Sequence, residues 1–173
     1  MHDVLKNNDN ENNSICCGKP PSASQIEMTE LVLPNDTNIL GNLLGGRLMH
    51  WIDIAGAMAA SRHSGRVVAT VALDSLDFRH PARMGELVIL KAKLTWVGRT
   101  SMEVTVRAYA ENYKTGSVIL TNKAYITYVA LDENGRPTPV PPLIIETEQE
   151  KKDFLEAEQR RQERLKRKHC DFE

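Results

Sequence analysis

The chain has 173 residues, of which 41% are hydrophobic and 26% are charged, and its formal net charge is -1. This length fits one domain with appended segments, and the apolar content favours a packed core over global disorder. The near-neutral charge disfavours bulk attraction to nucleic acid or to an anionic membrane. No apolar run approaches the roughly 20 residues of a transmembrane helix, and the N-terminus lacks the apolar core of a signal peptide. We therefore expect a cytoplasmic protein with no nucleic-acid or membrane partner.

The composition divides the chain into three segments. Residues 1–25 are rich in Asn, Ser and Pro and show no periodicity, which predicts a disordered polar arm that is dispensable for activity. Residues 26–143 carry all the strong patterning and are expected to form the domain. Residues 144–173 begin with acidic and end with basic side chains, an order that suits a helix dipole. We expect a charged C-terminal helix that is solvated or lies against a neighbouring subunit.

In chain order, the domain begins with a short strand at residues 27–33, which Pro34 ends, followed by a turn-rich loop at 35–46. A long helix then runs to Gly65, a plausible C-cap. Its apolar residues recur at the spacing of one helix face: Leu48, Trp51, Ile52, Ala55 and Ala59.

The segments after this helix have strand character. Residues 67–78 are β-rich, 87–96 and 102–111 alternate apolar and polar side chains, and 118–131 form a last strand. A single long helix beside so much antiparallel sheet must pack across one face of that sheet to bury its apolar stripe. The prediction is an α+β domain in which a curved sheet wraps one long helix.

Four short segments carry a family resemblance: 38–46 (NILGNLLGG), 72–78 (ALDSLDF), 97–102 (VGRTSM) and 130–136 (ALDENGR). In this order and spacing they resemble the hot-dog acyl-CoA hydrolases, over roughly residues 27–143. The resemblance implies a hot-dog fold and the hydrolysis of acyl-CoA to a free fatty acid and coenzyme A. It also implies a homodimer, often assembled further into a hexamer of three dimers.

Thioester hydrolysis needs a polarised carbonyl and an activated water, and residues of these segments can supply both. Gly46 lies at the start of the long helix, where exposed backbone N–H groups and the helix dipole favour negative charge on the thioester oxygen. The Asn42 amide can hold a carbonyl or a water. Asp74, on a strand among apolar neighbours, is the predicted general base, or the nucleophile of an anhydride route. Asp53 on the helix is a rival carboxylate that we rank lower, because it is placed to anchor a neighbouring strand.

The resemblance further implies that each site holds Asn42 of one subunit and Asp74 of the other. The coenzyme A phosphates call for cationic side chains. Arg99, Thr100 and Ser101 lie in the family's matching turn and are the first candidates, with Arg62 at the helix end as the second. We expect Trp51, Ala55 and Met58 to form the walls of the acyl pocket.

The sequence has no phosphate-binding glycine loop, dinucleotide fingerprint or metal-ligand spacing, so no metal and no cofactor is expected. Two alternative functions stay open. A hot-dog hydratase or dehydratase would pair a His with an acid, and His80 is the nearest such residue. A non-catalytic acyl-CoA sensor would bind the thioester without cleaving it. His50 and His63 are expected to face solvent or to pack.

Overall fold

The computed structural model describes residues 17–170, with side chains as far as residue 167. Its strands are β1 (Ile26–Leu31), β2 (Val67–Phe78), β3 (Leu87–Val97), β4 (Ser101–Asn112) and β5 (Ser117–Leu131). Its α-helices are α1 (Gly45–Ser64) and α2 (Glu148–Cys170), and two short 3-10 helices are η1 (Pro21–Ser24) and η2 (Pro34–Asp36). The predicted order of one strand, one long helix, four strands and a charged helix is confirmed.

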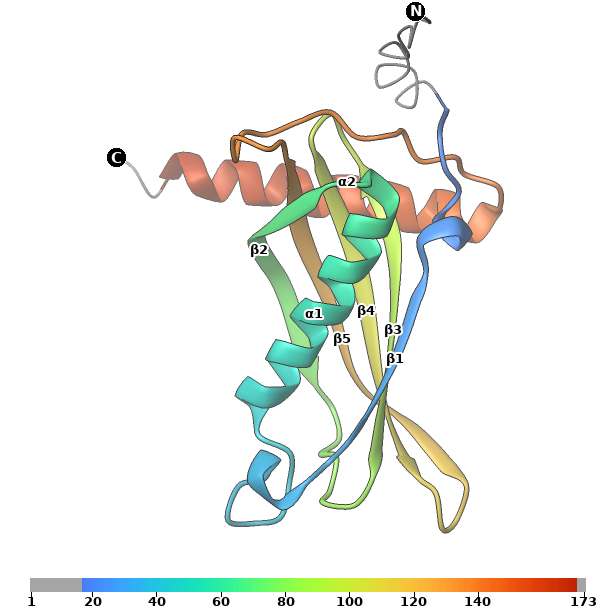
Figure 1. Cartoon of the computed structure of the whole chain (residues 1–173), viewed down its shortest axis with the longest axis vertical. Helices are drawn as coiled ribbons and strands as arrows, with labels where there is room; N and C mark the ends of the chain where they lie inside the picture. The colour runs from blue at the N-terminus through green and yellow to red at the C-terminus, as the bar shows by residue number, and fades with distance from the viewer. Residues whose placement is uncertain (1–16, 171–173) are drawn as a thin grey trace, which may run out of the picture.

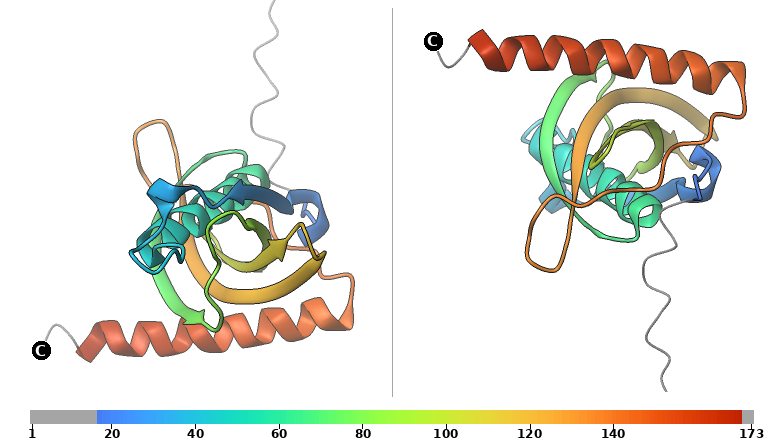
Figure 2. Two further views of the ribbon diagram at one scale, coloured as in Figure 1. Left: turned by 90° about the horizontal axis from the view of Figure 1, so that it is seen from below. Right: turned by 90° about the horizontal axis from the view of Figure 1, so that it is seen from above.

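The five strands form one antiparallel sheet in the order β1-β3-β4-β5-β2, so β1 and β2 are its edges. The sheet curls around α1, as the end-on views in Figure 2 show, and this is the expected hot-dog architecture. The β2–β5 register shifts between Thr70 and Ala72 and again between Leu73 and Ser75. These irregularities bend the edge strand where it passes the middle of α1.

The inner face of the sheet packs on the apolar stripe of α1. The five stripe residues predicted from the sequence are all buried: Leu48, Trp51, Ile52, Ala55 and Ala59. Gly56 brings the helix close to the sheet, because a Cβ at this position would collide with the Tyr128 side chain. Gly65 ends α1 with φ of 67°, a left-handed conformation that glycine adopts without strain.

The outer face of the sheet is covered by α2 (Figures 1 and 2). The Phe154 ring lies 6.4 Å from that of Trp96, Ala157 is buried, and Arg160 forms a 2.8 Å salt bridge with Glu103. The helix therefore lies on its own domain, where a solvated helix or one against a neighbouring subunit was expected. Because β4 is covered on both faces, every residue from Met102 to Val106 is buried.

The structure corrects the predicted boundary of the polar arm. Residues 17–25 belong to the ordered domain, because η1 packs near the end of α1 and Ser24 is buried. Lys19 bridges to Leu143, and its Nζ donates to the carbonyl oxygen of His63 at 2.8 Å. Residues 1–16 of the predicted arm lie outside the described residues. Within residues 17–170, no helix is long and apolar enough to cross a membrane.

Candidate active site

Asp53 lies midway along α1 and is held by hydroxyl groups from two strands. The Thr70 hydroxyl on β2 donates to Asp53 Oδ1 at 2.8 Å. The Tyr128 hydroxyl on β5 lies 3.2 Å from the same oxygen and 2.9 Å from the Asp53 carbonyl oxygen. Burial and the neighbouring Asp53 carboxylate raise the pKa of Tyr128, so this hydroxyl remains a donor. The expectation that Asp53 anchors a neighbouring strand is confirmed.

Asp53 also lines a cavity of about 210 Å³ between α1 and the β2–β5 side of the sheet, together with Met49, Ile52, Thr70, Leu73, Leu76 and Ile126. Asp53 and Thr70 are the polar side chains in this lining, and both are at one end of it. Oδ2 of Asp53 has no hydrogen-bond partner among residues 17–167, so it is available to a ligand. The predicted walls Trp51 and Ala55 are instead buried in the core, and the cavity uses the neighbouring face of α1.

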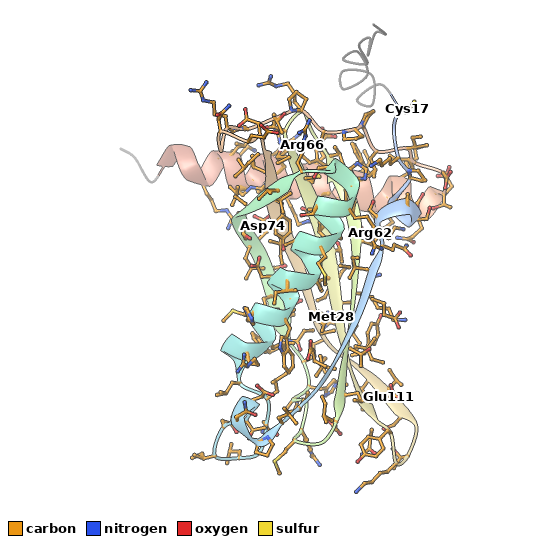
Figure 3. All side chains as sticks on the ribbon, in the orientation of Figure 1. Cys17, Met28, Arg62, Arg66, Asp74 and Glu111 are labelled. Atoms are coloured by element: carbon orange, nitrogen blue, oxygen red, sulfur yellow. The ribbon has the colours of Figure 1, made fainter. Side chains whose placement is uncertain are left out.

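Asp74 lies on the opposite face of β2, under α2 (Figure 3). Arg164 Nη1 of α2 forms a salt bridge with its Oδ2, Arg167 Nη2 is 4.0 Å from its Oδ1, and the Asp74 side chain is only 6% exposed. Burial raises the pKa of Asp74 above its usual value, and the charge of Arg164 offsets part of this rise. Asp74 is therefore an ion-paired carboxylate outside the cavity that holds Asp53.

The loop before α1 is organised by Asn38. Its side-chain Oδ1 accepts from the backbone N–H groups of Leu40 at 2.9 Å and Asn42 at 3.2 Å. Asn42 is half-buried and forms a backbone bridge with Arg83, so in one protomer it does not meet Asp74. Gly46 lies in the first turn of α1, and a Cβ there would meet nothing within 4 Å, so the helix surface is open at this position.

The residues predicted to bind coenzyme A lie at the other end of the molecule, where α1 ends. Arg99 is exposed in the β3–β4 turn, and the carbonyl oxygens of Arg99 and Thr100 accept from Val140 and Ala130, each at 3.0 Å. Ser101 begins β4. Arg62 already donates to the carbonyl oxygen of Gln25 at 2.6 Å, so its guanidinium is partly engaged within the chain.

A second cavity of about 290 Å³ lies between the β2–β3 loop and the β4–β5 hairpin, and its polar lining includes His80, Arg83 and Glu86. It is larger but shares no lining residue with the Asp53 cavity. Its carboxylate, Glu86, is bonded to the backbone N–H of Arg83 at 2.9 Å. No hydrogen bond or salt bridge joins His80 to Glu86 in the described part of the chain, so this cavity does not hold the His–acid pair that a hydratase would require. Within the described part of the chain, no group of three or more His, Cys, Asp or Glu side chains is arranged to hold a metal.

Sequence reasoning did not single out Asn38, Thr70 and Tyr128, which the structure shows in the loop before α1 and beside Asp53. Asn38 opens the loop motif that drew attention to Asn42, and its side chain organises that loop. Thr70 and Tyr128 are unremarkable β-formers in the sequence. Their hydroxyls acquire a role only because the fold brings both strands against Asp53.

Residues 40–117 match the model of the thioesterase superfamily. The chain is 42% identical over 145 residues to an uncharacterised acyl-CoA thioester hydrolase of Bacillus subtilis, YkhA. The aligned region covers 84% of this chain and 84% of that protein. Among solved structures, an apo-hexameric acyl-CoA thioesterase superposes with a TM-score of 0.84 at 41% identity, over 87% of this chain and 97% of that one.

An acyl-CoA hydrolase of Staphylococcus aureus, solved with butyryl coenzyme A and coenzyme A, has a TM-score of 0.82 and 34% identity over 88% of this chain and 93% of its own. Further structures of that enzyme carry an alanine in place of an asparagine, an aspartate or a threonine. In its sequence the aspartate follows the asparagine by 15 positions, and the threonine follows the aspartate by 17.

Proposed function

We propose that this chain, which belongs to the thioesterase superfamily, hydrolyses acyl-CoA thioesters to a free carboxylic acid and coenzyme A. The observation that carries the proposal is the Asp53 carboxylate at the polar end of an apolar cavity. Its Oδ1 is held by the Thr70 hydroxyl at 2.8 Å, and its Oδ2 has no bonded partner in residues 17–167. The apolar cavity can hold the acyl chain of the substrate, and the available carboxylate oxygen lies where the thioester carbonyl would be attacked.

We assign the catalytic carboxylate to Asp53, which reverses the ranking that the sequence favoured. Asn38, Asp53 and Thr70 are separated by the same 15 and 17 positions as the three residues replaced in the Staphylococcus aureus enzyme. Asp53 and Thr70 are in direct contact here, and both line the cavity. Asp74 is neutralised by Arg164 on the outer face of the sheet, where the apolar cavity does not reach it.

Asp53 can act by either of two routes. As a general base, Oδ2 takes a proton from water while the water oxygen attacks the thioester carbon. The C–S bond then breaks, and Asp53 returns the proton to the departing sulfur, which leaves as coenzyme A. As a nucleophile, Oδ2 attacks the carbonyl carbon itself, expels the thiolate and forms a mixed anhydride that water hydrolyses. In both routes the Thr70 and Tyr128 hydroxyls fix the carboxylate in one orientation. Water is the only co-reactant, so we propose that no cofactor takes part.

The carbonyl of the substrate needs a hydrogen-bond donor, and we propose that Asn38 supplies it with help from the start of α1 at Gly46. The Asn38 side-chain oxygen is used within its loop, which leaves the amide nitrogen to donate outward. Asn42 stabilises the same loop through its backbone. Within one protomer, Asp53 lies eight residues beyond Gly45 on the helix, which separates this loop from the carboxylate by about 12 Å.

That separation supports a site shared between two protomers, with the Asn38 loop of one beside Asp53 of its partner. β2 pairs with β5 on one side only; its other edge has no neighbouring strand among the described residues, and the strand exposes Val67, Val71 and Leu73 along its length. Pairing two β2 strands would cover this edge and form a two-fold symmetric dimer. We further propose a trimer of such dimers, because a similar structure is that of a hexameric acyl-CoA thioesterase.

For the coenzyme A phosphates we propose the turn of Arg99, Thr100 and Ser101, of which Arg99 is exposed and unpaired among the described residues. Arg62 is a weaker candidate, because its guanidinium is bonded to Gln25.

The test compares Asp53, at the cavity on the inner side of the sheet, with Asp74, on the outer side. Asp53→Asn should lower kcat by roughly 10²–10⁴-fold, the usual contribution of a general acid–base group, in a thiol-release assay with acyl-CoA. Asp74→Asn should keep kcat within tenfold of the native enzyme. Asp77→Asn, an exposed carboxylate on the same strand, is the matched control. Circular dichroism and sedimentation would verify that each variant is folded and assembled.

The proposal fails if Asp53→Asn retains more than a tenth of the native kcat. A loss on Asp74→Asn, with Asp53→Asn active, would restore the assignment that the sequence favoured. A protein that binds acyl-CoA but releases no thiol would instead be the acyl-CoA sensor considered above.

A further inference from the structure

We propose that the 210 Å³ cavity beside Asp53 receives the acyl chain and limits efficient hydrolysis to short and medium chains, up to about seven carbons. This inference rests on the proposed function and specifies its substrate class. It starts from the division of the cavity into a polar end, at Asp53 and Thr70, and an apolar remainder.

The cavity leads away from the carboxylate in one direction. On α1 it runs from Asp53 back one turn to Met49, and on β2 it runs from Thr70 past Leu73 to Leu76. The strand descends beside the ascending helix, as Figure 1 shows, so both walls extend toward the start of α1. A thioester carbonyl at Asp53 would therefore direct its acyl chain toward Leu76.

The floor of the cavity is fixed by core packing. Ile52 and Ile126 are 1% and 2% exposed, so neither can move aside without disturbing the core. Leu76 is half-buried at the far end, whereas Met49 and Leu73, at 43% and 46% exposed, stand at the opening. The pocket is therefore closed at its floor and open toward solvent or a second protomer.

The volume sets the chain length. If each methylene takes about the 30 Å³ that a water molecule occupies in the liquid, 210 Å³ holds about seven carbons. A longer chain has to leave between Met49 and Leu73, where its own protomer no longer encloses it. The lining beyond Asp53 and Thr70 offers no hydrogen-bond partner, so acyl chains with a distal hydroxyl or carboxylate should be disfavoured.

The test is a chain-length profile of the full-length enzyme with saturated acyl-CoA substrates of two to sixteen carbons. We expect kcat/KM to rise by about fourfold for each methylene buried, up to six to eight carbons, and then to level off or fall. Leu76→Phe, which fills the far end, should move this break to shorter chains by one or two carbons. Leu76→Ala should move it to longer ones.

Two further variants keep the test decisive. Leu73 is half-exposed within the protomer, so Leu73→Ala should fold even if Leu76 variants do not, and it should flatten the chain-length dependence by opening the pocket wall. Because Leu73 also lies on the β2 edge of the proposed dimer, sedimentation has to show that this variant is assembled like the native protein. Val118→Phe places the same bulk on an exposed position in β5 outside the cavity and should leave the profile unchanged.

An active enzyme whose kcat/KM rises steadily to sixteen carbons would overturn the inference, as would a profile that no Leu76 or Leu73 variant changes. The proposed function would survive either result. Absence of thiol release at every chain length would overturn the proposed function, and this inference with it.

Discussion

His63 shows how one residue type can have a structural role that its sequence position does not reveal. It is fully buried at the end of α1, with Nδ1 3.1 Å from the Ser24 hydroxyl and Nε2 2.9 Å from the carbonyl oxygen of Pro141. A neutral ring satisfies both contacts, because Nε2–H donates to Pro141 and Nδ1 accepts from Ser24. Burial lowers the pKa of His63, and the charge of Lys19 lowers it further, while the bond to Pro141 opposes part of this shift.

This depressed pKa predicts a loss of stability in mild acid. In the unfolded chain His63 binds a proton below its ordinary pKa of about 6.5, whereas the folded protein resists protonation there. The stabilisation is therefore fully present above pH 6.5 and is lost as the pH falls below it, at up to about 1.4 kcal/mol per pH unit. Denaturant unfolding between pH 8 and pH 5 measures it.

His63→Gln should be less stable than the native protein at pH 8, and the difference should shrink toward pH 5. His50→Gln, at an exposed position of the same helix, should leave the pH dependence as it is. If the unfolding free energies of the native protein and His63→Gln fell in parallel from pH 8 to pH 5, the pH dependence would come from a group other than His63.

Among the elements, the segment before β1 departs most from expectation. Its polar composition predicts disorder, yet residues 17–25 hold the start of the domain against the segment that follows β5. Lys19 bonds the backbone of Pro142 at 2.9 Å and the end of α1 through its side chain, and Ser24 reaches the His63 ring. Residues 17–25, the end of α1 at His63 and the backbone of Pro141 and Pro142 therefore meet in one cluster of contacts, which we call the clasp.

Two truncations separate the clasp from the residues before it. Deletion of residues 1–25 should lower the unfolding free energy by about 2–4 kcal/mol, because it removes the contacts of Ser24 and Lys19 with His63 and uncovers a buried ring. Deletion of residues 1–16 removes none of the described contacts and should leave stability and activity unchanged. Both are measured by thermal or denaturant unfolding, with thiol release as the activity readout. Equal stability of the two truncated proteins would show that the clasp contributes nothing.

For the whole molecule, the decisive feature is the open edge at β2. Asp53 and Thr70 contact each other within one protomer, where their side chains are 2.8 Å apart. The Asn38 loop of the same protomer lies at the start of α1, away from both. If two β2 strands pair antiparallel about a two-fold axis, as proposed, the two α1 helices would also be antiparallel. The beginning of one helix would then lie beside the later turns of the other, so that Asn38 of one protomer could approach Asp53 and Thr70 of its partner.

A mixing experiment tests the shared site. Asn38→Ala and Asp53→Ala, each inactive, are unfolded together in equal amounts and refolded. Random pairing makes about half the dimers mixed, and each mixed dimer has one intact site of two, so roughly a quarter of the native activity should return. The control is Asp53→Ala mixed with Thr70→Ala. These residues serve the same site from the same protomer, so no activity should return. Recovery in the control, or none in the test pair, would contradict the shared site.

The sequence by itself determined the class of the fold and the class of the reaction. Helix and strand periodicity are local properties, so the order of elements and the buried stripe of α1 could be predicted within a few residues. The motif before α1 likewise predicted a loop that leads directly into the long helix, as the structure shows. Composition alone was a poor guide at residues 17–25, because their few contacts are made to segments distant in sequence.

Only the tertiary structure distinguishes the surroundings of the two carboxylates, which is the basis for proposing Asp53. Both Asp53 and Asp74 lie among apolar neighbours in the sequence. Neither local pattern predicts whether the carboxylate faces the cavity on the inner side of the sheet or lies on its outer side. The register shifts in β2 and the arginines of α2 place Asp74 on the outer face, in an ion pair with Arg164. The strands that carry Thr70 and Tyr128 place Asp53 at the cavity. These contacts span 17 to 90 residues of sequence, and that distance is why no local signal could foretell them.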